Sequence, residues 1–229
     1  MKIGIILLVV ISQAAFASIA TDCYNSAISS LTVKNAVRLC SGAISSERTL
    51  TCYQEMFKTL EVDVAVKLCS GTFDIELTKN CLVDVSLKLP VENAAKLCSG
   101  THNPDITRDC FEFVTSPSEL NLSEEDAIKL CAGVESTQKT VDCFNNVMSG
   151  LGLTTKAAVE LCAAVVDEVA TKACFDKAVK TIPLKDATHL CSGTVKVENT
   201  FKCFGNVTDI SGLNLGIKEA SKLCAGARD

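Results

Sequence analysis

Cysteine is the residue type in this sequence with the most evident chemistry. The 229-residue chain contains 14 cysteines, two histidines and no tryptophan. Cysteine side chains form disulfides or bind zinc, and a zinc site typically draws on ligands closely spaced in the sequence. Successive cysteines are at least 12 residues apart, and the two histidines are not neighbours. We therefore expect disulfides, with no metal and no cofactor.

The spacing of the cysteines indicates an internal repeat. The gap between successive cysteines alternates between a constant 12 residues and a longer gap of 17, 19 or 21 residues. This alternation predicts a repeat of about 29 residues, and seven copies extend from the first cysteine to the last. The cysteines are Cys23, Cys40, Cys52, Cys69, Cys81, Cys98, Cys110, Cys131, Cys143, Cys162, Cys174, Cys191, Cys203 and Cys224.

Two local pairings fit this spacing. One bridges the longer gap within each repeat, and the other bridges the gap of 12 and leaves Cys23 and Cys224 unpaired. A turn near residues 60–61 is almost equidistant from Cys52 and Cys69, and equidistant residues face each other in an antiparallel hairpin. Facing residues meet the Cα separation of about 4.4–6.8 Å that a disulfide needs. We therefore favour the longer-gap pairing in every repeat.

The residues around the second cysteine of each repeat have a helical period. Ala stands four residues before it and Leu directly before it in all seven copies, and Gly stands two residues after it in six, with Ala164 as the exception. Residues with this spacing share one helix face, and the Gly is an expected left-handed stop. Around the first cysteine, a Thr three residues before and an aromatic directly after each occur in six copies. Each repeat is therefore expected to form two short helices.

The expected fold is all-α: a solenoid-like array of seven disulfide-stapled helical hairpin repeats of about 29 residues. A closed helical globule remains the alternative, because seven hairpins can curl into a compact body. Only 5% of residues are aromatic, so the disulfides must supply stability that aromatic packing usually provides, at about 3 kcal/mol for each closed loop. The extra residues of the longer repeats are expected at hairpin tips, at 116–118, 150–152 and 211–212.

The N-terminus resembles a secretory signal peptide. Lys2 precedes an apolar run over residues 3–11, and Ala15-Phe16-Ala17 matches a small-x-small cleavage pattern. We expect a signal peptide over residues 1–17, with cleavage after Ala17 or Ala20, and one helical repeat domain over residues 21–229. The run is too short to cross about 30 Å of hydrocarbon. The protein is therefore expected to be secreted, to an extracellular or periplasmic space, without a membrane span.

Charge and histidine content exclude several functions. The net charge of −5 argues against nucleic-acid binding, which leaves a basic excess. His102 lies in a connection between repeats, and His189 precedes a helix end. Neither has a nucleophile partner visible in the sequence, so the protein is not expected to be an enzyme.

A basic residue recurs two positions before the second cysteine, and Glu160 interrupts the series. One interpretation is that these cations stabilise helix C-termini, by about 0.3–1 kcal/mol each. The other is a stripe on an outer face of the array that binds an anionic polymer such as an acidic glycan. The basic residues are Arg38, Lys67, Lys96, Lys129 and Lys222.

Three functions remain as hypotheses. The leading one is a secreted, non-enzymatic binding or scaffold protein whose extended surface contacts an extracellular protein or glycan. The alternative is a carrier of a hydrophobic small molecule or lipid in a groove of the array. An enzyme, the third, would need a concave cluster joining a histidine to an acid or hydroxyl across repeats. Asn121 and Asn206 lie in glycosylation sequons.

Overall fold

The computed structural model describes residues 19–227, which form helices and connecting turns without a strand. The predicted signal peptide, residues 1–17, lies outside the described residues. Ala20, the second predicted cleavage position, is buried on the first helix. The outer helix of each hairpin is α1 (Ile19–Ala27), α3 (Ser46–Met56), α5 (Ile75–Val85), α7 (Pro104–Thr115), α9 (Thr137–Leu151), α11 (Glu168–Ala178) or α13 (Val197–Thr208). The inner helix is α2 (Val33–Cys40), α4 (Val62–Cys69), α6 (Val91–Leu97), α8 (Glu124–Cys131), α10 (Thr155–Cys162), α12 (Leu184–Cys191) or α14 (Ile217–Leu223).

One disulfide staples the two helices of each hairpin. The Cα atoms of the paired cysteines are 5.5–5.8 Å apart. This is the longer-gap pairing favoured from the spacing, and the repeat array of the predicted fold is present. The pairs are Cys23–Cys40, Cys52–Cys69, Cys81–Cys98, Cys110–Cys131, Cys143–Cys162, Cys174–Cys191 and Cys203–Cys224.

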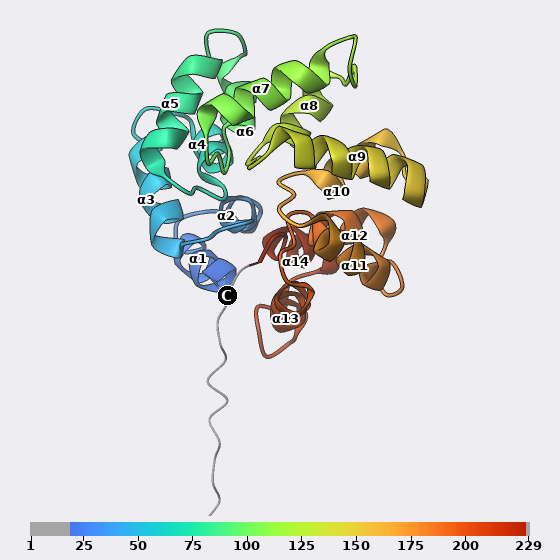
Figure 1. Cartoon of the computed structure of the whole chain (residues 1–229). Helices are drawn as coiled ribbons and strands as arrows, with labels where there is room; N and C mark the ends of the chain where they lie inside the picture. Colours follow the sequence, from blue (N-terminus) through green and yellow to red (C-terminus); the bar gives the residue numbers. More distant parts are fainter. Residues whose placement is uncertain (1–18, 228–229) are drawn as a thin grey trace, which may run out of the picture.

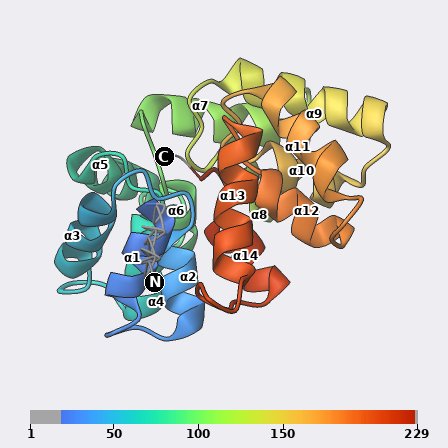
Figure 2. The same cartoon turned by 90° about the horizontal axis from the view of Figure 1, so that it is seen from below.

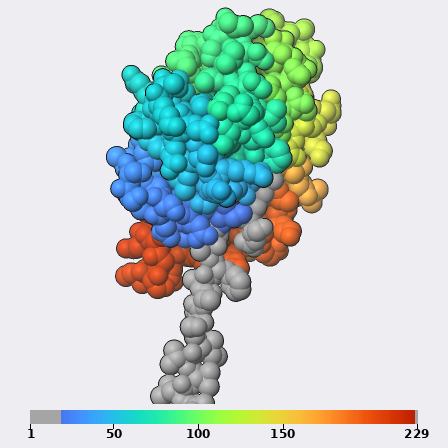
Figure 3. Space-filling model, turned by 90° about the vertical axis from the view of Figure 1, so that its left-hand side faces the viewer, coloured from blue at the N-terminus to red at the C-terminus, as the bar shows by residue number. Residues whose placement is uncertain are grey.

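The array closes into a ring (Figure 1). The inner helices pack on one another in chain order, and α14 then packs on α2. Across this joint the hydroxyl of Ser41 donates a hydrogen bond to the carbonyl oxygen of Lys222, at 2.6 Å. Figures 2 and 3 show the last repeat beside the first. The sequence left an open solenoid and a closed body as alternatives, and the structure is a solenoid that closes on itself.

A buried layer lies between the inner and outer helices. The Leu before the second cysteine is at most 1% exposed in every repeat, and the Ala three residues earlier is fully buried. The small Ala side chain lets the helices approach closely, and the buried disulfides fill space that aromatic rings fill in other cores. The leucines are Leu39, Leu68, Leu97, Leu130, Leu161, Leu190 and Leu223.

Each inner helix ends in a tight turn. In the first repeat Ser41 has φ −62° and ψ 128°, Gly42 has φ 65°, and the amide of Ala43 donates to the carbonyl of Cys40 at 3.2 Å. These values define a type II turn, which requires a positive φ at its third residue. Gly is therefore left-handed, as predicted, but within a turn that follows the helix. Ala164 adopts the same conformation, with φ 51°.

The seven turns lie against one another at one end of the ring. A methyl group added to Gly100 would lie 3.5 Å from the carbonyl oxygen of Gly71 and 3.6 Å from the Cα atom of Gly133. The hydroxyl of Ser99 donates to the carbonyl of Ser70 at 2.9 Å, which links neighbouring turns. The turns therefore form a continuous circle at this end of the ring, around a small cavity of about 170 Å³.

The hairpin tips lie at the opposite end of the ring from the turns. Residues 116–118 and 211–212 fall between the two helices of their hairpins, as predicted. In the fifth repeat the extra residues instead lengthen α9 to Leu151, and Gly152 ends the helix with φ 61°. In each case the longer repeat changes only the tip and leaves the inner ring regular.

Candidate functional site

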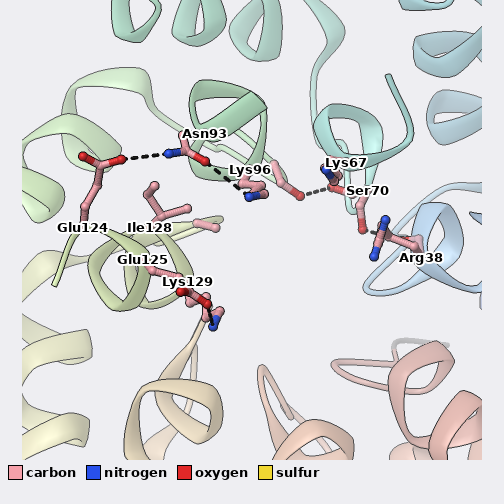
Figure 4. Close-up of a pocket in the computed structure, with 11 residues that line it drawn as sticks. Arg38, Lys67, Ser70, Asn93, Lys96, Glu124, Glu125, Ile128 and Lys129 are labelled. Atoms are coloured by element: carbon pink, nitrogen blue, oxygen red, sulfur yellow. Dashed lines mark hydrogen bonds and ion pairs between the residues drawn. The ribbon is translucent and has the colours of Figure 1, made fainter. Parts of the chain in front are cut away.

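The ring surrounds a central cup whose wall is built by the inner helices. Two adjoining cavities, of about 620 and 690 Å³, occupy it, and both are lined by Arg38, Ser70 and Lys129. Their lining residues come from all seven inner helices and the turns that follow them. Figure 4 shows the first of the two cavities.

Equivalent positions of the seven inner helices form layers in the cup, because every helix is held in the same register by its disulfide. The floor layer, one residue after the second cysteine, consists of Ser41, Ser70, Ser99, Ala132, Ala163, Ser192 and Ala225. The middle layer, two residues before that cysteine, consists of Arg38, Lys67, Lys96, Lys129, Glu160, His189 and Lys222. The upper layer, one helical turn nearer the hairpin tips, consists of Lys34, Asp63, Glu92, Glu125, Lys156, Lys185 and Lys218.

The basic series predicted from the sequence is therefore the middle layer of the cup. The expectation that it lies on an outer face was wrong, because closing the ring turns this helix face toward the axis. Its side chains are only partly exposed; that of Lys67 is 15% exposed. The series brings together five cations that are as much as 184 residues apart in the chain, from Arg38 to Lys222.

On the side of α4, α6 and α8, acidic residues neutralise these cations. Lys67 and Lys96 both pair with Glu92, Lys96 at 3.9 Å, and Lys129 pairs with Glu125 at 2.6 Å. The neighbouring lysine ammonium groups lower the pKa of Glu92 and of Glu125. We call this side the neutral half of the cup.

An amide network continues the neutral half across two repeats. The side-chain amide of Asn93 donates to Glu124 at 2.8 Å and its oxygen accepts from Lys96 at 3.3 Å, as Figure 4 shows. The polar groups of this wall therefore have partners within the protein itself.

The other side of the cup has an excess of cations. We call it the cationic half, and it is formed by α10, α12, α14 and α2. The cavity of about 690 Å³ lies on this side. It is lined by Glu160 and Glu219 and by four cations without an ion-pair partner among residues 19–227. These cations are Lys34, Arg38, Lys218 and Lys222.

The pKa of Lys222 is lowered, in part by the same excess of cations. Burial lowers the pKa of its ammonium group, and the nearby charges of Lys218, Arg38 and Lys185 lower it further. Glu160 is the acid that opposes this shift. Cations thus repel one another here, and an anion entering the cup would relieve that repulsion.

His189 and Glu160 lie side by side in the cationic half. Nε2 of His189 is 3.4 Å from Oε1 of Glu160, and the two side chains are 18% and 21% exposed. They join a histidine to an acid across repeats, which the enzyme hypothesis required. The nearby hydroxyls of Ser41 and Ser192 donate to backbone carbonyls, at 2.6 and 2.8 Å. The hydroxyls of this wall thus link neighbouring repeats.

The remaining predicted positions do not line either of the two cavities of the cup. His102 lines a smaller cavity of about 170 Å³ beside the turns, with its ring 4.5 Å from that of Phe73 and its Nε2 3.7 Å from Glu135. Asn121, at a hairpin tip with φ 48°, and Asn206, on α13, are both exposed. The structure places the two sequons on the surface, and glycosylation stays a prediction.

Metal-binding clusters and membrane-spanning helices are both absent from the described part of the chain. Residues 19–227 hold no group of three or more His, Cys, Asp or Glu side chains placed to bind a metal. Within the same range, no helix has the length and apolar character needed to cross a membrane.

Sequence reasoning missed the upper layer and the division of the cup into two halves. The signal was present six residues before the second cysteine, where four lysines occur in consecutive repeats once the ring closes and three acids fill the other places. Comparison of the chain with protein-family models, curated proteins and solved structures finds no match.

Proposed function

We propose that this protein is a secreted, non-enzymatic binding protein that holds an anionic ligand in its central cup. The observation that carries the proposal is the cationic half, where four cations face a cavity of about 690 Å³ without ion-pair partners among residues 19–227. Arg38 and Lys222 are half-buried, and Lys34 and Lys218 are exposed. Cations with unused hydrogen-bond donors are the groups that recognise carboxylate, phosphate and sulfate. The distribution of charges in the cup thus supports a ligand inside the ring in place of one on an extended outer surface.

Secretion is supported by the disulfides. Seven buried disulfides occur within residues 19–227 and no cysteine there is free. Disulfides of this density persist in oxidising compartments outside the cytosol. Together with the predicted signal peptide over residues 1–17, they support an extracellular or periplasmic location.

A carrier of hydrophobic small molecules is the second candidate, and exposed apolar residues at the starts of the inner helices favour it; one of them, Val33, lines the second cavity. The first residue of five inner helices is a large apolar side chain that is 36–51% exposed. These residues belong to repeats that are consecutive around the closed ring, and they could contact an apolar part of a ligand. They are Leu184, Ile217, Val33, Val62 and Val91.

Calorimetric titration with a panel of small molecules tests the proposal. The panel contains acetate, citrate, pyrophosphate and a sulfated disaccharide, with glucose as the neutral ligand and the uncharged dye Nile red as the apolar one. We expect at least one anion to bind once per ring, with an affinity that falls as salt rises. Binding of Nile red alone would support the carrier, and no binding by any anion would contradict the proposal.

A further inference from the structure

The joint that closes the ring differs from the other joints in the charges that meet there. Where cations face one another at other joints, they do so in one layer alone, as Lys185 and Lys218 do in the upper layer. Several other joints carry a bridging ion pair or amide hydrogen bond, as in Lys67–Glu92 and Asn93–Glu124. Such bridges favour contact between the repeats that they join.

At the joint between α14 and α2, cations face cations in both layers. Lys222 and Arg38 occupy the middle layer, and Lys218 and Lys34 occupy the same places in the upper layer. Arg38 lowers the pKa of Lys222 through charge repulsion. All four line one cavity, so the first and the last repeat each contribute a pair of cations to a single space.

We propose that a small anion with at least two negative charges binds between these two pairs and staples the first repeat to the last. This inference rests on the proposed function and assigns its ligand class and its place in the cup. A multivalent oxyanion carries enough acceptors to contact Arg38 on one side and Lys222 on the other. Phosphate and carboxylate groups share this chemistry.

The staple has a structural consequence. Without the anion, the described contacts that hold the joint closed are the packing of α14 on α2 and the hydrogen bond from Ser41 to the carbonyl of Lys222. With it, like charges that oppose closure become ligands of one group. The closed ring binds the anion more tightly than an opened ring does, so the anion stabilises closure.

Two neutralising variants test the site, Lys222→Gln and Arg38→Gln, with Lys139→Gln on the exposed surface of α9 as the matched control. Titration uses pyrophosphate and citrate separately, so that the two sources of oxyanion are distinguished. We expect each cup variant to weaken binding by about ten-fold or more, and the control to leave it unchanged. Acetate, with one charge, should bind much more weakly than either.

Thermal unfolding, measured with and without anion, separates loss of the anion site from general destabilisation of the fold. In the absence of anion, Lys222→Gln removes a repulsion and should raise the melting temperature above that of the unsubstituted protein. In saturating pyrophosphate the order should reverse. Hydrogen exchange of α2 and α14 should slow on binding more than exchange of α6 and α8.

The outcomes separate this inference from the proposed function. Binding that survives both cup variants, or a melting order that does not reverse, overturns the staple. If the sulfated disaccharide binds the cup but neither pyrophosphate nor citrate binds, the joint site is wrong while the proposed function stands. If no anion binds, both fail.

Discussion

Glu160 and His189 are the two members of the middle layer that differ from the lysine or arginine found in other repeats. Burial lowers the pKa of His189, Lys222 and Lys185 lower it further, and Glu160 and Asp186 oppose the shift. A histidine whose pKa is below its ordinary value of about 6.5 is neutral at pH 7. The charge of the cationic half near neutral pH therefore comes from its lysines and Arg38.

This shift predicts a pH dependence of stability. Between the folded pKa of His189 and its unfolded value of about 6.5, the unfolded chain binds more protons than the folded one. The free energy of unfolding should therefore fall as the pH drops through this window, and be unaffected by His189 above it. His189→Asn should reduce that fall, as measured by chemical denaturation across the pH range.

The other histidine provides the comparison. His102→Asn removes a side chain that lies outside the cup, beside Phe73 and Glu135, and separates its contribution from that of His189. A pH profile that is the same with and without His189 would contradict the assignment.

The helices and their staples are the elements that spacing alone could predict. A helix face repeats every three to four residues, so the Ala, Leu and Cys positions indicate inner helices whatever the tertiary structure. A turn midway between the two cysteines of a repeat likewise favours the longer-gap disulfides. The type II turns were only partly predictable, because the left-handed Gly is a sequence signal whereas the extended residue before it is Ser in some repeats and Ala in others, as at Ser41 and Ala132.

The turns predict opposite effects for two substitutions. Ala164→Gly removes a left-handed alanine and should raise the free energy of unfolding by about 0.5–1 kcal/mol, after allowing for the flexibility of glycine in the unfolded chain. Gly100→Ala places a methyl group at φ 65° and should lower it by about 1 kcal/mol or more. Chemical denaturation of both variants measures the difference. Equal effects in the same direction would show that the positive φ does not decide stability here.

Closure of the ring belongs to the whole molecule and could not be predicted from the repeat. Whether seven hairpins form an open spiral or a ring depends on a small rotation between neighbours, which accumulates around the array. Neighbouring turns approach closely at their Gly positions, but the spacing of Ala, Leu, Cys and Gly within one repeat does not specify that rotation. Arg38 and Lys222 face the central cavity because the ring closes. The sequence could therefore identify the basic series but could not place it in a cup.

Cross-linking of lysines within a single chain tests closure most directly. Lys34 and Lys218 are 184 residues apart in the chain but line one cavity, whereas Lys67 and Lys96 lie on adjacent repeats in an open or a closed array. A short amine-reactive cross-linker followed by peptide mapping should join Lys34 to Lys218 or Lys222, alongside the Lys67–Lys96 control. Formation of the control link without any link between the first and last repeats would contradict the closed ring and the cup that depends on it.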